Sequence, residues 1–338
     1  MLRYVVRRLI QLVVVMFVLS LLLFLWLRSL PGGPDSAICG ERCSAEQRAA
    51  VRHSLGMDQP IWVQYFKYMG RVFSGNFGVS SAVDPGTSAA QVFFHRLPAT
   101  IELTIGALIF ALVLGIPLGY FAARRKGGWF DNLGIIGSLV GIAIPVFFLA
   151  YLLKFLFAVK LGWMPDSGRQ STNLSPPATR VTGFFVLDGL ITREWDAAWD
   201  AFKHLILPAI ALGTIPFAVI FRITRSSVID VQNEDYVRTA EAKGLTTQVV
   251  RRRHILRNAM LPVVTVTGLQ VGGLLAGAVL TETVFAYPGL GQATAIAFQQ
   301  RDFAVLQVLV LASAATFILV NLLVDLSYAL IDPRIRTR

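Results

Sequence analysis

Six long apolar runs constrain this 338-residue chain more than any other feature of its sequence. About 20 apolar residues in a helix cross the roughly 30 Å hydrocarbon core of a bilayer. A helix also satisfies its own backbone hydrogen bonds, which lipid cannot do. We therefore expect an all-α, polytopic membrane protein with six transmembrane helices, at Leu9–Leu27, Ala99–Ala123, Leu133–Val159, Leu205–Phe221, Val263–Ala286 and Val305–Ile331.

The composition agrees with a membrane protein. Hydrophobic residues make up 55% of the chain and charged residues only 15%, and the mean hydropathy is +0.61. Soluble domains carry about 25% charged residues, so a soluble two-domain protein is excluded. The fourth run is the shortest and contains Pro208 and Pro216. It is kept as a span because membrane helices tolerate proline where neighbours satisfy the freed carbonyls.

The distribution of Lys and Arg predicts the orientation. With the N-terminus inside, the cytoplasmic segments 1–8, 124–132, 222–262 and 332–338 hold 17 Lys and Arg. The segments on the opposite side, 28–98, 160–204 and 287–304, are together about twice as long but hold only 13. Since basic residues accumulate in cytoplasmic loops, we expect a multi-pass membrane protein with both termini cytoplasmic. The net charge of +11 then reflects topology and contact with anionic lipid, and predicts no nucleic-acid partner.

The N-terminal run is too long to be a cleaved signal peptide. An apolar signal region spans about 7–15 residues and ends in small residues. Here the run continues through Phe24, Leu25, Trp26 and Leu27. It predicts an uncleaved first span.

Cys39 and Cys43 are the only two cysteines and lie in the first external segment. In an oxidising compartment they could form a disulfide, and they could equally remain thiols, so both alternatives stay open. A zinc site is disfavoured because His53, the only nearby histidine, would leave it one ligand short.

Two external segments have helical character. Residues 45–75 place apolar and aromatic side chains at helical spacing, with Pro60 near the start of a second helix. Residues 163–204 begin with a stretch rich in Pro, Ser and Thr and end in an amphipathic helix that leads into the fourth span. In that helix Trp195 and Trp199 are i, i+4 neighbours, typical of interfacial depth.

Polar residues inside the spans are few, namely Glu102, Lys154, Gln270, Glu282, Asn321 and Asp325. Ion-coupled carriers place charges near the middle of the bilayer. Glu102 and Glu282 lie near helix ends, so they are interpreted as structural hydrogen-bonding groups. The fifth span supplies small residues for close helix packing, within this subunit or against another, at Gly268, Gly272, Gly273 and Gly277.

Motifs for catalysis are missing. The sequence contains no GxxxxGK[ST] phosphate loop, no HExxH and no GxSxG. Its four histidines are scattered over loops and span edges. We therefore expect a chain that is not an enzyme and holds no cofactor of its own. The long internal segment 222–262 nevertheless suggests that something cytoplasmic acts on the chain.

That segment admits three kinds of partner: nucleic acid, lipid phosphate or protein. Its basic residues are Arg222, Arg225, Arg238, Lys243, Arg251, Arg252, Arg253 and Arg257. Residues Glu234–Lys243 have helical spacing, and Gly244 suits the left-handed residue that ends a helix. A basic helix is expected next, at Thr247–Asn258. The residues alone favour equally a helix that enters a protein cleft and one that lies on the inner leaflet.

The stretch YVRTAEAKGL followed by RHILRNAMLP resembles the cytoplasmic loop of ABC-importer permeases. In that family an EAA-x3-G signature forms a short helix that docks on the ATPase subunit. Counted back from Gly244, the signature falls on Arg238-Thr239-Ala240, with Arg in place of Glu and Thr in place of the first Ala. Both departures resemble the dipeptide and oligopeptide branch, as do LPGGPD, GWMPDSG, ETVFAYPGLGQA and NLLVDLSYALIDPRIR.

The resemblance implies a type I ABC-importer permease fold, a place in a bacterial inner or plasma membrane and a role in peptide uptake. It implies a homologous second permease subunit, two ATPase subunits that hold ATP and Mg, and an extracytoplasmic peptide-binding protein as partners. Close relatives in that family also carry nickel, haem or glycans. The rival from another class is a secondary transporter or channel that works alone.

The resemblance also implies an organisation of the chain. Residues 1–98 would form the first span with its external segment, and 99–338 a five-helix core with an external insertion at 163–204 and the ATPase-coupling loop at 222–262. The residues expected to carry coupling are Asp235, Tyr236, Arg238, Thr239, Ala240, Glu241, Ala242, Lys243 and Gly244.

Overall fold

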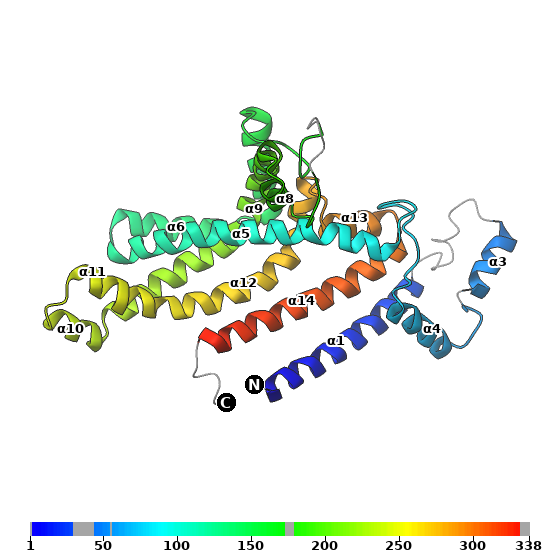
Figure 1. Cartoon of the computed structure of the whole chain (residues 1–338), viewed down its shortest axis with the longest axis horizontal. Helices are drawn as coiled ribbons and strands as arrows, with labels where there is room; N and C mark the ends of the chain where they lie inside the picture. The colour runs from blue at the N-terminus through cyan, green and yellow to red at the C-terminus, as the bar shows by residue number, and fades with distance from the viewer. Residues whose placement is uncertain (1, 30–43, 55, 173–178, 332–338) are drawn as a thin grey trace. The chain divides into compact units, whose positions relative to one another are not determined.

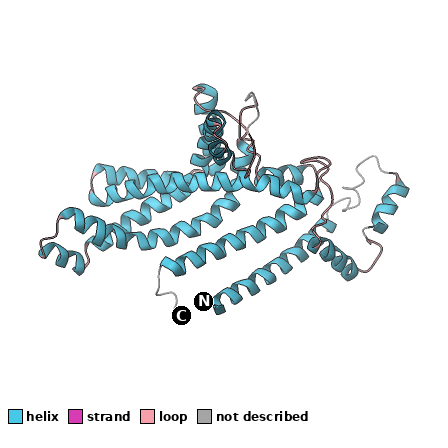
Figure 2. Cartoon of the chain, viewed as in Figure 1, coloured by secondary structure: helices cyan, strands magenta, loops and turns pink. Residues whose placement is uncertain are grey.

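The computed structural model describes residues 2–29, 44–54, 56–172 and 179–331, and in this part it is built from helices (Figures 1 and 2). A single antiparallel bridge joins Val79 and Ser88 in the described part. The α-helices are α1 (Leu2–Ser29), α3 (Ala45–Ser54), α4 (Ile61–Phe73), α5 (Ala89–Arg124), α6 (Trp129–Ala143), α7 (Val146–Leu153), α8 (Phe185–Ile191), α9 (Trp195–Gln232), α10 (Asp235–Ala242), α11 (Thr247–Val249), α12 (Arg257–Val284), α13 (Leu290–Gln299) and α14 (Phe303–Ile331). Two further segments are π-helical, η1 (Lys154–Lys160) and η2 (Val250–Leu256).

Among the described residues, five helices are long and apolar enough to cross a membrane, and a bent pair makes a sixth if its two halves count as one span. The five lie at Ile10–Ser29, Ala89–Arg124, Trp195–Gln232, Thr247–Leu275 and Phe303–Leu322. The expectation of an all-α, polytopic membrane protein is confirmed. Cys39 and Cys43 lie outside the described residues, so their pairing stays a prediction.

The third predicted span is not one straight helix. It consists of α6 and α7 with η1, bent by 104° at a short break. The break contains Ile144 and Pro145, and Ile144 is extended, with φ −75° and ψ 124°. A proline disfavours the α conformation of the residue before it, which agrees with the extended conformation of Ile144 at this bend.

The fourth predicted span is part of a much longer helix. α9 runs for 38 residues and contains Pro208 and Pro216 without a break. It begins at Trp195, which confirms the predicted amphipathic helix that leads into this span. Trp195 and Trp199 remain 63% and 57% exposed.

The chain divides into two compact units. Unit 1 comprises Met1–Pro98, Pro288–Leu323 and Pro333–Arg338, and unit 2 comprises Ala99–Tyr287 and Val324–Asp332. Segment Pro288–Leu323 thus belongs to the same unit as the N-terminal segment. The predicted division into 1–98 and 99–338 concerns function and not compactness, so it stays a prediction.

The core of unit 1 joins α1, α4, the first turns of α5, α13 and the start of α14. Its largest buried side chains include Phe24, Tyr68 and Phe303. The two predicted helices of segment 45–75 are present as α3 and α4, and Pro60 directly precedes α4. Proline suits this position because its fixed φ is compatible with entry into a helix.

α9 is the central helix of unit 2 and packs against α6, α7, α8 and α12. It approaches α5 closely enough to exclude side chains: a Cβ on Gly119 would lie 2.6 Å from the carbonyl oxygen of Phe221. By contrast, Gly273 of α12 has open space around it. A Cβ on Gly213 of α9 would in turn lie 2.7 Å from the carbonyl oxygen of Ala107, so the contact between α5 and α9 uses glycines of both helices.

Candidate functional site

α10 projects from the rest of unit 2 as a short helix with defined ends. It begins after Glu234, which is extended, and lies beside α11 and the start of α12 (Figure 1). Gly244 has a φ of +75°, and its N–H donates to the carbonyl of Glu241 at 2.9 Å. The left-handed glycine predicted to end this helix is confirmed. A Cβ at Gly244 would meet no atom within 4 Å, so the backbone conformation and not crowding selects glycine here.

One face of α10 is fixed to unit 2 by apolar packing. Val237 and Ala240 are 2% and 5% exposed, and they belong to a cluster that contains Val228, Val250 and Ile255. The i→i+5 bonds of η2 bring residues five positions apart toward one face, which explains why Val250 and Ile255 both point into this cluster. Burial of α10 on this cluster holds in place a helix too short to be stable alone.

The opposite face of α10 is exposed and polar. Of the nine predicted coupling residues, Ala240 is buried and eight are exposed, namely Asp235, Tyr236, Arg238, Thr239, Glu241, Ala242, Lys243 and Gly244. Asn258 donates from Nδ2 to the hydroxyl oxygen of Tyr236 at 3.0 Å, which ties the aromatic ring to α12. Arg238 approaches Asp235 only at 3.9 Å, and both are highly exposed, so this ion pair contributes little. The face is therefore exposed and polar with one aromatic side chain, while Val237 and Ala240 pack into the fold.

The predicted basic helix Thr247–Asn258 is not a separate element. α11, η2 and α12 form one continuous helical run, and Pro262 lies inside it. Arg252 and Arg253 are exposed and Arg251 is partly buried. The sequence predicted a helix that ends at Asn258 and a separate span that begins at Val263. The helix continues between them, and Val250, Ile255 and Ala259 of this continuous run pack in the α10 cluster.

An ion pair that the sequence did not reveal supports this end of unit 2. Arg225 of α9 donates from Nε and from a second nitrogen to Asp131 of α6, the latter at 2.7 Å. Asp131 also accepts the N–H of Gly127 at 2.9 Å. Arg225, expected to lie in a basic loop, is thus used inside the chain. The two residues lie 94 positions apart, so spacing gave no signal of the pairing.

A second buried polar cluster lies at Glu102 of α5. Arg169 donates to Glu102 Oε2 from two nitrogens, one at 2.9 Å, and the N–H of Val186 donates to Oε1 at 2.9 Å. Tyr287 donates to the same carboxylate at 3.3 Å, and burial raises the pKa of its hydroxyl. The arginine also lies 3.9 Å above the ring of Phe185. The interpretation of Glu102 as a structural hydrogen-bonding group is confirmed.

The segment around Arg169 is fixed at further points. The N–H of Gly168 donates to the carbonyl of Phe285 at 2.9 Å. Asp188 accepts the backbone N–H and hydroxyl of Thr182 at 2.8 and 2.6 Å. Burial alone would raise the pKa of Asp188, but these hydrogen bonds and that from the Gly183 N–H lower it. Segment 163–204 is therefore attached to unit 2 through buried charges, which its Pro- and Ser-rich sequence did not indicate.

Glu282 is fully buried and accepts the hydroxyl of Thr100 at 2.6 Å. Val284 follows closely in the same helix, and its carbonyl accepts a hydrogen bond from Lys154 of η1 at 3.0 Å. The hydrogen-bonding role expected for Glu282 is also confirmed. Glu282 lies near the end of α12, whereas Glu102 lies in the interior of α5, because that helix already begins at Ala89.

These features define a class: a polytopic α-helical membrane protein with a glycine-capped surface helix between two of its spans. The family model for the binding-protein-dependent transport system inner membrane component matches residues 115–337. A second model, "Binding-prot-dependent transport system membrane comp, N-term", matches residues 1–104. The chain belongs to the family of binding-protein-dependent transport system inner membrane components.

Similar proteins extend over the whole chain. It is 46% identical, over 99% of both chains, to the dipeptide transport system permease protein of Escherichia coli. It is 45% identical, over 99% of both chains, to the di/tripeptide transport system permease protein of Pseudomonas aeruginosa. It is 44% identical to the dipeptide transport system permease protein of Alkalihalophilus pseudofirmus, over 99% of this chain and 100% of the relative.

Proposed function

We propose that this chain is the membrane-spanning permease subunit of an ATP-driven importer of di- or oligopeptides. The observation that carries the substrate class is identity of 44–46% over 99% of the chain to relatives named for dipeptide or di/tripeptide transport. Nickel, haem and glycans are the alternative cargoes for a permease of this kind. Mass spectrometry of the ligand retained by the co-purified binding protein tests the class. Short peptides are the expected result, and a metal complex or a glycan would contradict it.

The driving force is proposed to come from two ATPase subunits, which would hold ATP and Mg, while this chain catalyses nothing. The exposed polar face of α10 supports this role. It is a rigid surface, because Val237 and Ala240 anchor it and Gly244 ends it. A helix held in this way can transmit a partner's movement through η2 into α12. A homologous second permease and an extracytoplasmic peptide-binding protein complete the proposed complex.

A stand-alone secondary transporter is the competing function. Reconstitution separates the two: we expect peptide uptake only when the ATPase subunits and ATP are present. Uptake driven by a proton gradient in vesicles that contain the purified single chain would contradict the proposal. An ion-coupled carrier needs a charged group inside its spans that can bind and release the ion. Glu102 already accepts hydrogen bonds from Arg169, Val186 and Tyr287, which favours the importer.

The proposed orientation places both termini in the cytoplasm. It rests on the 17 Lys and Arg of the cytoplasmic segments against 13 in the opposite segments, which are together about twice as long. In this orientation α10 faces the cytoplasm, where the ATPase subunits are proposed to bind, and the end of α1 at Ser29 faces outward.

A further inference from the structure

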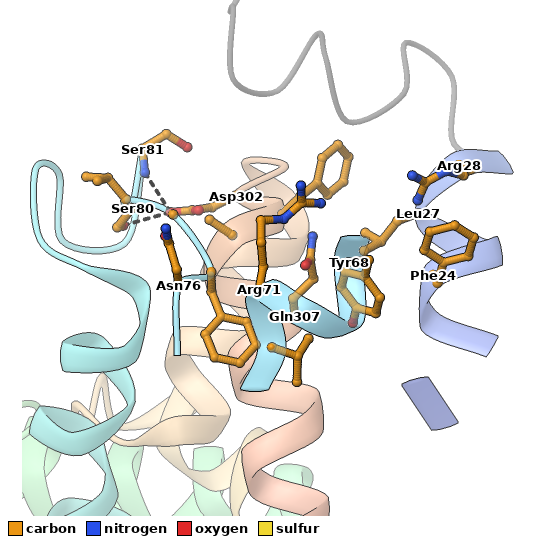
Figure 3. A pocket seen from close by; sticks show the side chains of 16 residues that line it. Phe24, Leu27, Arg28, Tyr68, Arg71, Asn76, Ser80, Ser81, Asp302 and Gln307 are labelled. Atoms are coloured by element: carbon orange, nitrogen blue, oxygen red, sulfur yellow. Dashed lines mark hydrogen bonds between the residues drawn. The ribbon is translucent and has the colours of Figure 1, made fainter. Parts of the chain in front are cut away.

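Unit 1 contains a cavity of about 400 Å³ that the coupling role of α10 does not use. It is lined by residues from α1, from α4, from the loop that follows α4 and from the start of α14 (Figure 3). Cavities of about 300–1,000 Å³ are typical of small-molecule sites. In the proposed orientation this cavity lies at the end of α1 that faces outward.

Two of the three charged residues that line the cavity are basic. Arg28 and Arg71 line it (Figure 3), and both are partly buried. Within the described residues neither arginine forms an ion pair. Arg28 uses Nε for a hydrogen bond to the neutral Gln64 at 2.9 Å, which leaves its terminal nitrogens available. Its guanidinium lies 3.6 Å from the centroid of the Phe24 ring, which fixes the plane of the charge.

Asp302 also lines the cavity, but its carboxylate is already occupied (Figure 3). Oδ2 accepts the hydroxyl of Ser80 at 2.7 Å and the N–H groups of Ser81 and Ala82 at 3.0 Å, and of Val83 at 3.3 Å. Oδ1 accepts the N–H of Val305 at 3.3 Å. Because protein donors already engage both oxygens, this carboxylate is a poor partner for the arginines or for an ammonium group of a ligand.

Tyr68 adds a third polar group to the lining of the cavity. It is 4% exposed and lines the cavity, and its hydroxyl has no hydrogen-bond partner within the described part of the chain. A buried hydroxyl without a partner is costly, so such groups are rare in folded proteins. Burial raises the pKa of Tyr68 to about 12, which keeps the hydroxyl protonated and able to donate. The two guanidinium groups and the protonated hydroxyl are all hydrogen-bond donors, so an anionic acceptor would suit this cavity.

We propose that this cavity binds the terminal carboxylate of a short peptide, with Arg71, Arg28 and Tyr68 as donors. The inference rests on the proposed transport of peptides. Arginine binds carboxylates through paired N–H groups, and the remaining lining suits the rest of a dipeptide. Phe24, Leu27 and Phe77 offer apolar surface to a side chain, while Asn76 and Gln307 offer amides to the peptide group.

The lining predicts which end of the peptide matters. Because Asp302 is already engaged by the protein, the cavity offers no free carboxylate to the peptide's ammonium group. Titration calorimetry on the purified full-length chain in lipid nanodiscs tests this with three probes at millimolar concentration. We expect Ala-Ala and N-acetyl-Ala-Ala to bind alike, and Ala-Ala-amide to bind at least about tenfold more weakly, as the loss of one charged hydrogen bond implies.

Variants identify the donors. Arg71→Gln should weaken Ala-Ala binding at least about tenfold, and Tyr68→Phe, which removes only the hydroxyl, should weaken it several-fold. Arg52→Gln, an exposed residue of α3 outside the cavity, is the matched control and should bind as the wild type does. The thermal unfolding midpoint of each variant checks that the chain remains folded.

Four results would overturn the inference. They are no binding of Ala-Ala to the wild type, binding of Ala-Ala-amide as tight as that of Ala-Ala, unchanged Ala-Ala binding in Arg71→Gln, and binding of inorganic phosphate or acetate as tight as that of Ala-Ala. If Arg71→Gln leaves Ala-Ala binding unchanged but abolishes uptake, the arginine would instead be assigned to a contact with an acidic side chain of the binding protein. Peptide import by the wild-type complex without peptide binding by the single chain would reject this inference and leave the proposed function standing. Failure of the complex to import peptides would reject the function itself.

Discussion

Individual buried charges determine how the segments outside the spans are attached. Glu102 and Arg169 are 7% and 5% exposed, and they join α5 to a segment 67 positions later. Burying a charge is costly unless it is paired, so either partner alone would be worse than neither. Asp302 plays the same part in unit 1, where it orders the loop that follows Ser80.

This asymmetry predicts the behaviour of the Glu102–Arg169 pair. Glu102→Gln and Arg169→Met should each destabilise the folded chain by about 3–5 kcal/mol, because each leaves one buried charge without its partner. The double variant should be less destabilised than the sum of the two. Thermal unfolding in detergent measures all three.

The exposed pair His53–Asp58 is the control, since its side chains are 83% and 51% exposed. Asp58→Asn should change the midpoint little, as exposed ion pairs contribute at most about 1 kcal/mol. Additive effects in the Glu102–Arg169 double variant would show that the two residues do not interact.

At the scale of elements, local signals predicted helices well and bends poorly. Pro60 and Gly244 marked helix ends because each acts through its own backbone conformation. Pro145 and Pro216 show the limit: the first coincides with a 104° bend, and the second lies inside an unbroken helix. Their outcomes depend on packing with helices distant in the sequence, which a local pattern does not contain.

The candidate site shows the same limit. The helix α10 and its cap were visible in the sequence, and the burial of Ala240 was not, because it depends on Val250 and Ile255. The cavity of unit 1 combines Arg28, Tyr68 and Gln307 from three helices. Such a combination becomes visible only once the chain is folded.

The close approach of α5 and α9 gives a prediction for an element contact. Gly119→Ala should destabilise the chain by about 1–3 kcal/mol, because the new Cβ would lie 2.6 Å from the backbone oxygen of Phe221. Gly137→Ala in α6 is the matched control, since nothing lies within 4 Å of its Cβ position. Thermal unfolding of both variants provides the comparison. Equal midpoints would mean that α5 and α9 do not pack this closely.

At the scale of the whole molecule, the orientation in the membrane is the first prediction. In a variant with Cys39 and Cys43 replaced by Ser, single cysteines at Pro85 and Ser171 should react with an impermeant maleimide in intact cells. Single cysteines at Lys126 and Thr247 should react only after the cells are opened. All four positions lie outside the predicted spans, so access to them reports orientation. Labelling of a cysteine at position 247 in intact cells would contradict this orientation.

The central claim is that partner ATPases drive transport through α10. The direct measurement is peptide uptake and ATP hydrolysis on one preparation of the reconstituted complex, with Gly244→Val in this chain. Valine at a φ of +75° costs at least about 1–2 kcal/mol, so the end of α10 should distort while the spans still assemble. Gly244→Asn, which tolerates a left-handed conformation, is the matched control.

The account predicts that Gly244→Val loses uptake and that its ATP hydrolysis no longer responds to the loaded binding protein. Gly244→Asn should retain most of both activities. Neutralising Arg251, Arg252 and Arg253 together should leave the stimulation of ATP hydrolysis largely intact, because these residues lie outside α10. Normal coupling in Gly244→Val, with coupling lost in the triple arginine variant, would move the coupling role to the basic segment and contradict the account.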